Sequence, residues 1–227
     1  MVFDEYIDEL SPVIFSGNNG KRLFVTAKEN RFSILVFRDD FTVITISIEY
    51  LDKIRHFFDI NGDDVFSENA LNWIKEHFSL NSCENPIEHV YVADDEKQHN
   101  HVSCTKQPVC IDYTVIKGLD PNPFKKYPFR NAENHFIYFG IYENNNPVCL
   151  VSGYVKDTKI VELTGETLTE YREKGYAKAV TSAITGHLLN EGYIVITKNG
   201  INNAASIRTV QSLGFKECAR ELKFAIK

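Results

Sequence analysis

The sequence predicts a protein of mixed α+β class, with an N-terminal domain of strands and helices followed by a C-terminal mixed α/β sheet flanked by helices. Three observations support this prediction: short runs of β-branched and aromatic residues, longer segments whose apolar residues recur at helical spacing, and a turn-rich stretch between the two halves. The chain has 227 residues, of which 43% are hydrophobic and 25% charged. A chain of this length and composition buries a sizeable core without needing cross-links.

The N-terminal half begins with β-branched and aromatic runs separated by polar turns, which predict a small antiparallel meander, and two further strands follow later. The expected strands cover residues 22–27, 32–37, 41–48, 87–93 and 109–116. Two helices are expected between them. One runs from Tyr50 to Phe58, and the other is capped by Ser67 and continues through Phe78, because their apolar residues recur at helical spacing.

A polar loop over residues 94–107 contains three side chains that often bind metals, namely His99, His101 and Cys104. A zinc site needs a fourth ligand or a water and a rigid frame, and this loop has no paired ligand motif. We therefore expect a solvated loop and no metal.

The stretch from Lys117 to Asn134 is polar and rich in turn-forming residues, among them Asp120-Pro121-Asn122-Pro123. We place the domain boundary here, with one domain over residues 1–116 and a second over 117–227.

The C-terminal half alternates strands and helices more regularly. The expected strands cover residues 136–142, 148–155, 160–168, 193–197 and 217–226, and the first two form a hairpin around residues 143–147. A long helix is expected from Tyr176 until Gly192 ends it, and a shorter one over residues 203–213.

A glycine-containing loop connects the strand over 160–168 to the long helix. The first backbone N–H groups of a helix have no partner within it and carry its positive end, so they form a site for a pyrophosphate. Gly175 and Ala177 allow the backbone of this loop to approach a ligand closely, and Arg172 and Lys174 add positive charge. The alternative is that Gly175 only shapes a turn.

Further motifs follow this loop in a fixed order: Arg172-x-x-Gly175-x-Ala177 and the long helix come first, then Asn203-x-x-Ser206, then Leu213-Gly214-Phe215. This arrangement, over roughly residues 136–227, resembles the GNAT superfamily of N-acetyltransferases. The resemblance implies a mixed sheet that splays beside the strand ending at Leu168, and a slot there for acetyl-CoA.

By the same resemblance, the loop holds the pyrophosphate through backbone amides, the end of the preceding strand pairs with the pantetheine arm, and the later helix lies beside the cofactor. The residues implied to bind acetyl-CoA are Glu166, Thr167, Leu168, Arg172, Glu173, Lys174, Gly175, Tyr176, Ala177, Asn203 and Ser206. Asn203 has an equally weighted alternative role as a helix N-cap, and the two roles are compatible.

An amine must lose a proton when it attacks a thioester, so a carboxylate near the splayed strand is expected as the general base. Glu162 is the candidate, because some GNAT enzymes have their catalytic glutamate at the matching place. Glu162, Thr164 and Glu166 alternate on one face of the strand, and Glu166 lies nearer the loop. Either carboxylate could instead be a solvated strand residue.

The sequence departs from the GNAT pattern in two places. Many members have a tyrosine four residues before the final Gly-Phe, thought to protonate the leaving thiolate, and this chain has Val210 there. The strand and two helices that usually wall the acceptor site are compressed into residues 109–134, so the resemblance does not identify the substrate.

The charge and cysteine content limit the function classes. The net charge of -6 is spread along the chain without a basic stripe, which disfavours nucleic acid as a partner. An odd number of cysteines, the acidic first residues and the lack of a long apolar run indicate a cytoplasmic protein that binds no membrane. We expect an acetyl-CoA-dependent N-acetyltransferase acting on a small-molecule or peptide amine. Two alternatives remain open, a non-catalytic acyl-CoA-binding module and an enzyme that uses longer acyl chains, and a homodimer is possible for any of them.

Overall fold

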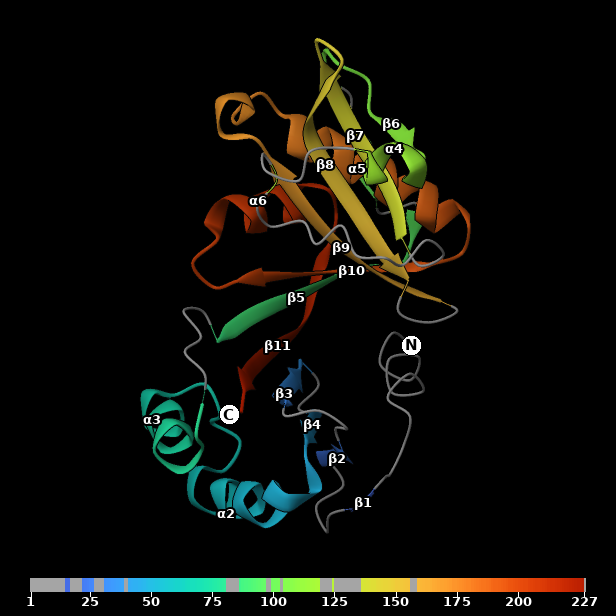
Figure 1. Cartoon of the computed structure of the whole chain (residues 1–227). Coiled ribbons are helices and arrows are strands. Elements are labelled where there is room, and N and C mark those ends of the chain that lie inside the picture. The colour runs from blue at the N-terminus through green and yellow to red at the C-terminus, as the bar shows by residue number, and fades with distance from the viewer. Residues whose placement is uncertain are drawn as a thin grey trace. The chain divides into compact units, whose positions relative to one another are not determined.

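The computed structural model describes residues 15–16, 22–26, 31–38, 41–80, 86–96, 99–102, 104–118, 124, 136–155 and 159–226. The chain divides into two compact units, whose elements are drawn in Figure 1. Unit 1 contains Tyr91–Lys198 and Asn203–Glu217, and unit 2 contains Leu10–Val90, Asn199–Asn202 and Cys218–Lys227. In this division residues 91–116 belong to unit 1, whereas the expected boundary lay between residues 116 and 117. Cys218–Lys227 belongs to unit 2, where the last strand of the chain pairs with a strand from the N-terminal half.

Unit 2 is built on a mixed sheet in the order β1-β2-β4-β3-β11. The strands are β1 (Phe15–Ser16), β2 (Arg22–Thr26), β3 (Arg31–Phe37), β4 (Thr42–Ile46) and β11 (Lys216–Ala225). β3 pairs antiparallel with β4 on one edge and with β11 on the other, where Leu222 lies opposite Ile34. β2 pairs with β4 in parallel, so the expected antiparallel meander is wrong for this strand. Because β11 occupies the second edge of β3, β2 is left with the free edge of β4.

The helices of unit 2 agree well with the sequence pattern. A 3₁₀ turn η1 (Ile48–Tyr50) leads into α2 (Leu51–Asn61), and α3 (Glu68–His77) follows. The Ser67 hydroxyl accepts a hydrogen bond from the Ala70 amide at 3.2 Å, which confirms the predicted N-cap. The core between sheet and helices is formed by side chains with no solvent exposure, among them Phe32, Ile34, Ile44, Ile54, Phe57, Ile74 and Leu222.

Unit 1 contains a mixed sheet in the order β5-β10-β9-β8-β7-β6, and of β5 the residues Tyr91–Ala93 belong to this unit. Four of the strands predicted for the C-terminal half are β7 to β10 of this sheet, whereas the strand predicted over residues 217–226 is β11 of unit 2. Its strands are β5 (Ile87–Ala93), β6 (Val109–Ile111), β7 (Phe136–Glu143), β8 (Asn146–Val155), β9 (Ile160–Thr167) and β10 (Ile194–Gly200). The pairs β6–β7, β7–β8 and β8–β9 are antiparallel, and the pair β9–β10 is parallel. This mixed sheet with its helices confirms the predicted fold class.

In the described part of unit 1, the helices that accompany this sheet are α4 (Tyr113–Lys117), α5 (Tyr176–Asn190) and α6 (Ala204–Ser212). α5 packs against β7, β8 and β9. Alternate residues of β8 separate two cores, since Cys149 and Val151 join the cluster around α5 whereas Leu150 joins a cluster that includes Ile116 of α4. α5 therefore covers one face of the sheet and α4 packs on the other.

The β7–β8 hairpin is tighter than the sequence predicted. The expected loop over residues 143–147 is reduced to Asn144 and Asn145, both with positive φ, at 49° and 64°. Asparagine tolerates the left-handed region, and two such residues form the turn that matches the twist of a hairpin.

The strand predicted over residues 109–116 is divided into two elements. β6 ends at Ile111, and the Asp112 carboxylate accepts hydrogen bonds from the amide and the hydroxyl of Thr114, at 2.7 and 2.5 Å. This N-cap starts α4, so the apolar pattern that predicted a strand belongs partly to a helix. Most of the turn-rich stretch over residues 117–134 lies outside the described residues.

No helix in the described part of the chain is long and apolar enough to cross a membrane.

Candidate functional site

The sheet of unit 1 opens where β9 and β10 separate. The two strands pair in parallel from Ile194 opposite Ile160 to Thr197 opposite Leu163, and their pairing ends there although β9 continues to Thr167. The Thr197 hydroxyl contacts the Leu163 carbonyl at 3.5 Å at this last pair. The backbone of β9 beyond Leu163 thus has an edge that β10 does not cover.

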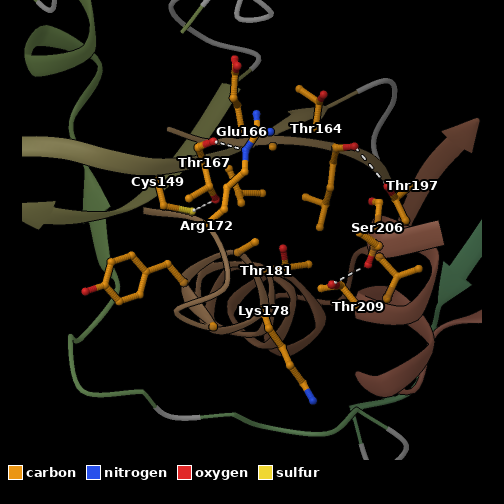
Figure 2. A pocket seen from close by; sticks show the side chains of 18 of the residues that line it. Cys149, Thr164, Glu166, Thr167, Arg172, Lys178, Thr181, Thr197, Ser206 and Thr209 are labelled. Carbon is orange, nitrogen blue, oxygen red and sulfur yellow. Dashed lines mark hydrogen bonds between the residues drawn. The ribbon is translucent and has the colours of Figure 1, made fainter. Parts of the chain in front are cut away.

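A cavity of about 590 Å³ lies beside this open edge. It is lined by the end of β9, by β8, by the turn before α5 and by α6 (Figure 2). The lining residues that bear on the argument are Cys149, Val151, Glu166, Thr167, Gly175 and Val210. Both predicted features, the splayed strands and the glycine loop, thus meet in one cavity.

The turn before α5 has an unusual backbone. Glu173 and Gly175 both have positive φ, at 64° and 78°, and Gly175 precedes the first helical residue, Tyr176. A Cβ atom placed on Gly175 would meet nothing within 4 Å, so the space in front of this residue is open. Gly175 is the N-cap residue and has no side chain that could cap the start of α5. The first N–H groups of α5 are therefore available to an anion from the cavity.

The two basic residues of the turn, Arg172 and Lys174, differ in whether they line the cavity. Arg172 lines the cavity, and its Nε donates to the Thr167 carbonyl at 3.2 Å, as Figure 2 shows. Lys174 is not among the lining residues, and its Nζ lies 4.6 Å from the centre of the Tyr171 ring. Arg172 thus closes the turn onto the end of β9.

α6 contributes the far wall of the cavity. The Asn203 side chain accepts a hydrogen bond from the Ser206 amide at 3.3 Å, which confirms the N-cap alternative for this residue. Asn203 and Ser206 both line the cavity as well. Capping and lining are compatible here.

The C-terminal region of the chain is similar to a known protein family. The family model described as FR47-like protein matches residues 138–224. An acetyltransferase from the GNAT family of Colwellia psychrerythraea is 16% identical with a TM-score of 0.50, over 86% of this chain and 80% of that one. The C-terminal region has the GNAT fold.

Two further solved structures agree with this assignment. A Novosphingobium aromaticivorans protein described as an acetyltransferase of the GNAT family is 14% identical with a TM-score of 0.51, over 66% of this chain and 68% of that one. A GCN5-related N-acetyltransferase from Kribbella flavida is 13% identical with a TM-score of 0.50, over 70% of this chain and 64% of that one. No curated protein matches the sequence. The structural similarity shows the GNAT fold. At such low sequence identity it does not show the reaction.

Most of the residues that the resemblance assigned to the cofactor lie together at the cavity of unit 1. The cavity is lined by Glu166, Thr167, Arg172, Glu173, Gly175, Tyr176, Ala177, Asn203 and Ser206, and not by Leu168 or Lys174. Leu168 instead packs against the cluster on the α4 face of the sheet.

The two candidate bases occupy different positions along β9. Glu162 lies opposite Tyr154 and Ile196, within the paired part of the strand, and does not line the cavity. Glu166 lies beyond the last β9–β10 pair and does line it. Figure 2 shows Glu166 and Thr164 pointing away from α5. Glu162 belongs to the same face of β9, because side chains alternate along a strand.

Several cavity residues were missed by sequence reasoning, in particular Cys149 and Val151 of β8, Thr197 of β10, and Thr209 of α6. Cys149 has no solvent exposure, and the Thr167 hydroxyl donates to its sulfur at 3.1 Å. Burial raises the pKa of the Cys149 thiol to about 11, so the thiol stays protonated at neutral pH. These residues occur in ordinary strand and helix patterns, and no local signal marks them as lining a site.

The histidine-containing loop has a structural role. His99 is buried, and its Nδ1 and Nε2 lie 3.1 and 3.0 Å from the carbonyl oxygens of Leu213 and Ser182. The Val102 amide donates to the Ser182 hydroxyl at 2.9 Å, so the loop joins α5 to the end of α6. Among the described residues, no group of three metal-binding side chains comes together.

Proposed function

We propose that the protein is an N-acyltransferase that moves an acetyl group from acetyl-CoA to an amine. One observation carries the proposal: an uncovered stretch of β9 and the uncapped start of α5 line the same cavity. An acyl-CoA has an extended arm with two amides next to a pyrophosphate, so it needs a strand edge and an anion site side by side.

The described residues fit such a ligand. The backbone of Thr164–Thr167 offers hydrogen-bonding groups to the pantetheine amides, and the first amides of α5 offer donors to the pyrophosphate. Open space at Gly175 admits the phosphate oxygens, and Arg172 adds a positive charge at the cavity wall. Asn203 and Ser206 would lie beside the ligand from α6.

The chemistry follows from direct attack. The amine nitrogen attacks the thioester carbonyl, the C–N bond forms as the C–S bond breaks, the nitrogen loses a proton and the CoA thiolate takes one up. Glu162 is our candidate for the base, acting from the face of β9 away from α5, with Glu166 as the alternative closer to the cavity. Val210 has no proton to give, so the thiolate must be protonated by another group or by solvent.

A non-catalytic acyl-CoA-binding module is a second candidate. Val210 is 4% exposed and lines the cavity where many GNAT enzymes have a tyrosine, and Glu162 does not line it. Both facts suit a module that binds acyl-CoA without turnover.

The first test is calorimetric titration of acetyl-CoA into the wild type, Gly175→Glu and Gly192→Glu. Gly192 is a matched control, since its φ is 84°, open space surrounds it, and it lies past the other end of α5. We expect Gly175→Glu to weaken binding by more than the ~1.4 kcal/mol that corresponds to tenfold, and Gly192→Glu to bind as the wild type does. A folded wild type that binds no acetyl-CoA would refute the proposal.

The second test separates the enzyme from the binder. CoA release across a panel of small and peptide amines should occur in the wild type and fall at least ~100-fold in kcat in Glu162→Gln, with little change in acetyl-CoA affinity. The same loss in Glu166→Gln but not in Glu162→Gln would transfer the role of base to Glu166. Tight binding without release for any amine favours the binding module.

A further inference from the structure

Three side chains form a chain of polar contacts beside the turn that opens α5. The Tyr176 hydroxyl donates to Glu143 Oε1 at 2.5 Å, and Lys106 Nζ lies 3.2 Å from Glu143 Oε2. Tyr176 is the first residue of α5, Glu143 is the last residue of β7, and Lys106 belongs to the loop before β6. The contacts thus tie the start of one helix to two segments distant in sequence.

Tyr176 is well placed to control the turn. It follows Gly175 directly, its side chain is 5% exposed, and it lines the cavity. The hydrogen bond to Glu143 raises the pKa of Tyr176 to about 12, and the same bond, together with Lys106, lowers the pKa of Glu143. At neutral pH the pair is therefore a protonated phenol donating to a carboxylate, which is the stronger, charge-assisted kind of hydrogen bond.

The charge of Glu143 would by itself disfavour an anion at the start of α5. Lys106 makes an ion pair with the carboxylate, and Lys174 also acts on it electrostatically. The carboxylate can therefore anchor Tyr176 while its negative charge is balanced.

We infer that the Tyr176–Glu143 hydrogen bond, balanced by Lys106, is a positioning device that holds the first turn of α5 in place for the pyrophosphate of an acyl-CoA. The inference rests on the proposed function. Tyr176 acts through the backbone amides of the turn, so it is a positioning residue. Its loss should affect ligands that carry a pyrophosphate and spare those that do not.

The experiment compares Tyr176→Phe with the wild type in titrations of CoA and of pantetheine, which lacks the pyrophosphate. We expect CoA to bind about tenfold more weakly to the variant and pantetheine to bind equally well. In an active enzyme, the KM for acetyl-CoA should rise while kcat is retained. Tyr193→Phe is the control, because Tyr193 follows the other end of α5 and does not line the cavity.

Glu143→Ala provides an independent check. It should weaken CoA as much as Tyr176→Phe does, and the double variant should be no weaker than either single one, because both changes remove the same bond. Additive losses, an equal loss of pantetheine, or unchanged CoA binding in Tyr176→Phe would each overturn the inference. A wild type that does not bind CoA would instead overturn the proposed function.

Discussion

The helices α5 and α6 both line the cavity with their N-terminal residues, but the two helices begin in different ways. α6 begins at a residue whose own side chain caps it, since Asn203 accepts a hydrogen bond from the Ser206 amide. α5 begins at Gly175, which has positive φ and provides no side-chain cap. A helix start that is capped internally is complete without a ligand, whereas an uncapped one leaves donors for an anion. Under the proposed function, the charged group of the ligand belongs at α5, and α6 serves mainly as a wall.

The largest expected effect tests whether the anion site depends on the anchoring of α5. Leu188 has no solvent exposure and packs in the core at the other end of that helix. Leu188→Ala should lower the free energy of unfolding by about 3 kcal/mol, because it leaves a cavity in the core. Urea denaturation measures this loss, and acetyl-CoA affinity at low temperature should stay near that of the wild type. A collapse of affinity in folded protein would show that the start of α5 is not a local feature.

A smaller effect separates the two helix starts directly. Asn203→Ala removes a cap and Gly175→Ala puts a side chain into a left-handed conformation, so each should cost about 1 kcal/mol of stability. Thermal unfolding should show similar losses for both variants. Titration should show a loss of acetyl-CoA affinity mainly in Gly175→Ala, and equal affinities would remove the distinction between the two helices.

The smallest expected effect concerns His99, in the loop that joins α5 to the end of α6 through contacts with the Ser182 and Leu213 carbonyls. Burial lowers the pKa of His99 below its ordinary value of 6.5 and outweighs the hydrogen bond to the Ser182 carbonyl, which raises the pKa. His101 acts in the same direction as burial, and the Leu213 carbonyl and Glu96 oppose it. The folded state therefore takes up a proton less readily than the unfolded chain. The contribution of His99 to stability is complete above pH 6.5 and is lost as the pH falls toward the lowered pKa.

This pH dependence is measured by urea denaturation between pH 8 and pH 5 in the wild type and in His99→Gln. The variant should lose less stability than the wild type across the acid part of this range. His187→Gln is the control, because His187 is exposed and its Nε2 lies 3.3 Å from Glu191 Oε1. If the free energy of unfolding depends on pH in the same way in His99→Gln and in the wild type, His99 is not the source of the pH dependence.

Several features were predictable because a few neighbouring residues encode them. Ser67 and Asn203 cap their helices as predicted, and the GNAT resemblance is confirmed for the C-terminal region. Val210, which occupies the place of a tyrosine in many GNAT enzymes, lines the cavity.

Other features were not predictable from neighbours. The parallel pairing of β2 with β4 depends on β11 taking the second edge of β3, and β11 lies at the other end of the chain. His99 binds carbonyl groups of Ser182 and Leu213, so a loop that looked solvated is partly buried.

The sequence by itself determined the helix caps at Ser67 and Asn203, the glycine turn before α5 and the order of strands and helices in the C-terminal half, because backbone preferences and capping groups act over a few residues. Only the tertiary structure decided which strand edges meet, which carboxylate of β9 lies at the cavity, and that Tyr176 reaches Glu143. These outcomes depend on which edges and faces remain free once the rest of the chain has folded, and no local pattern carries that information.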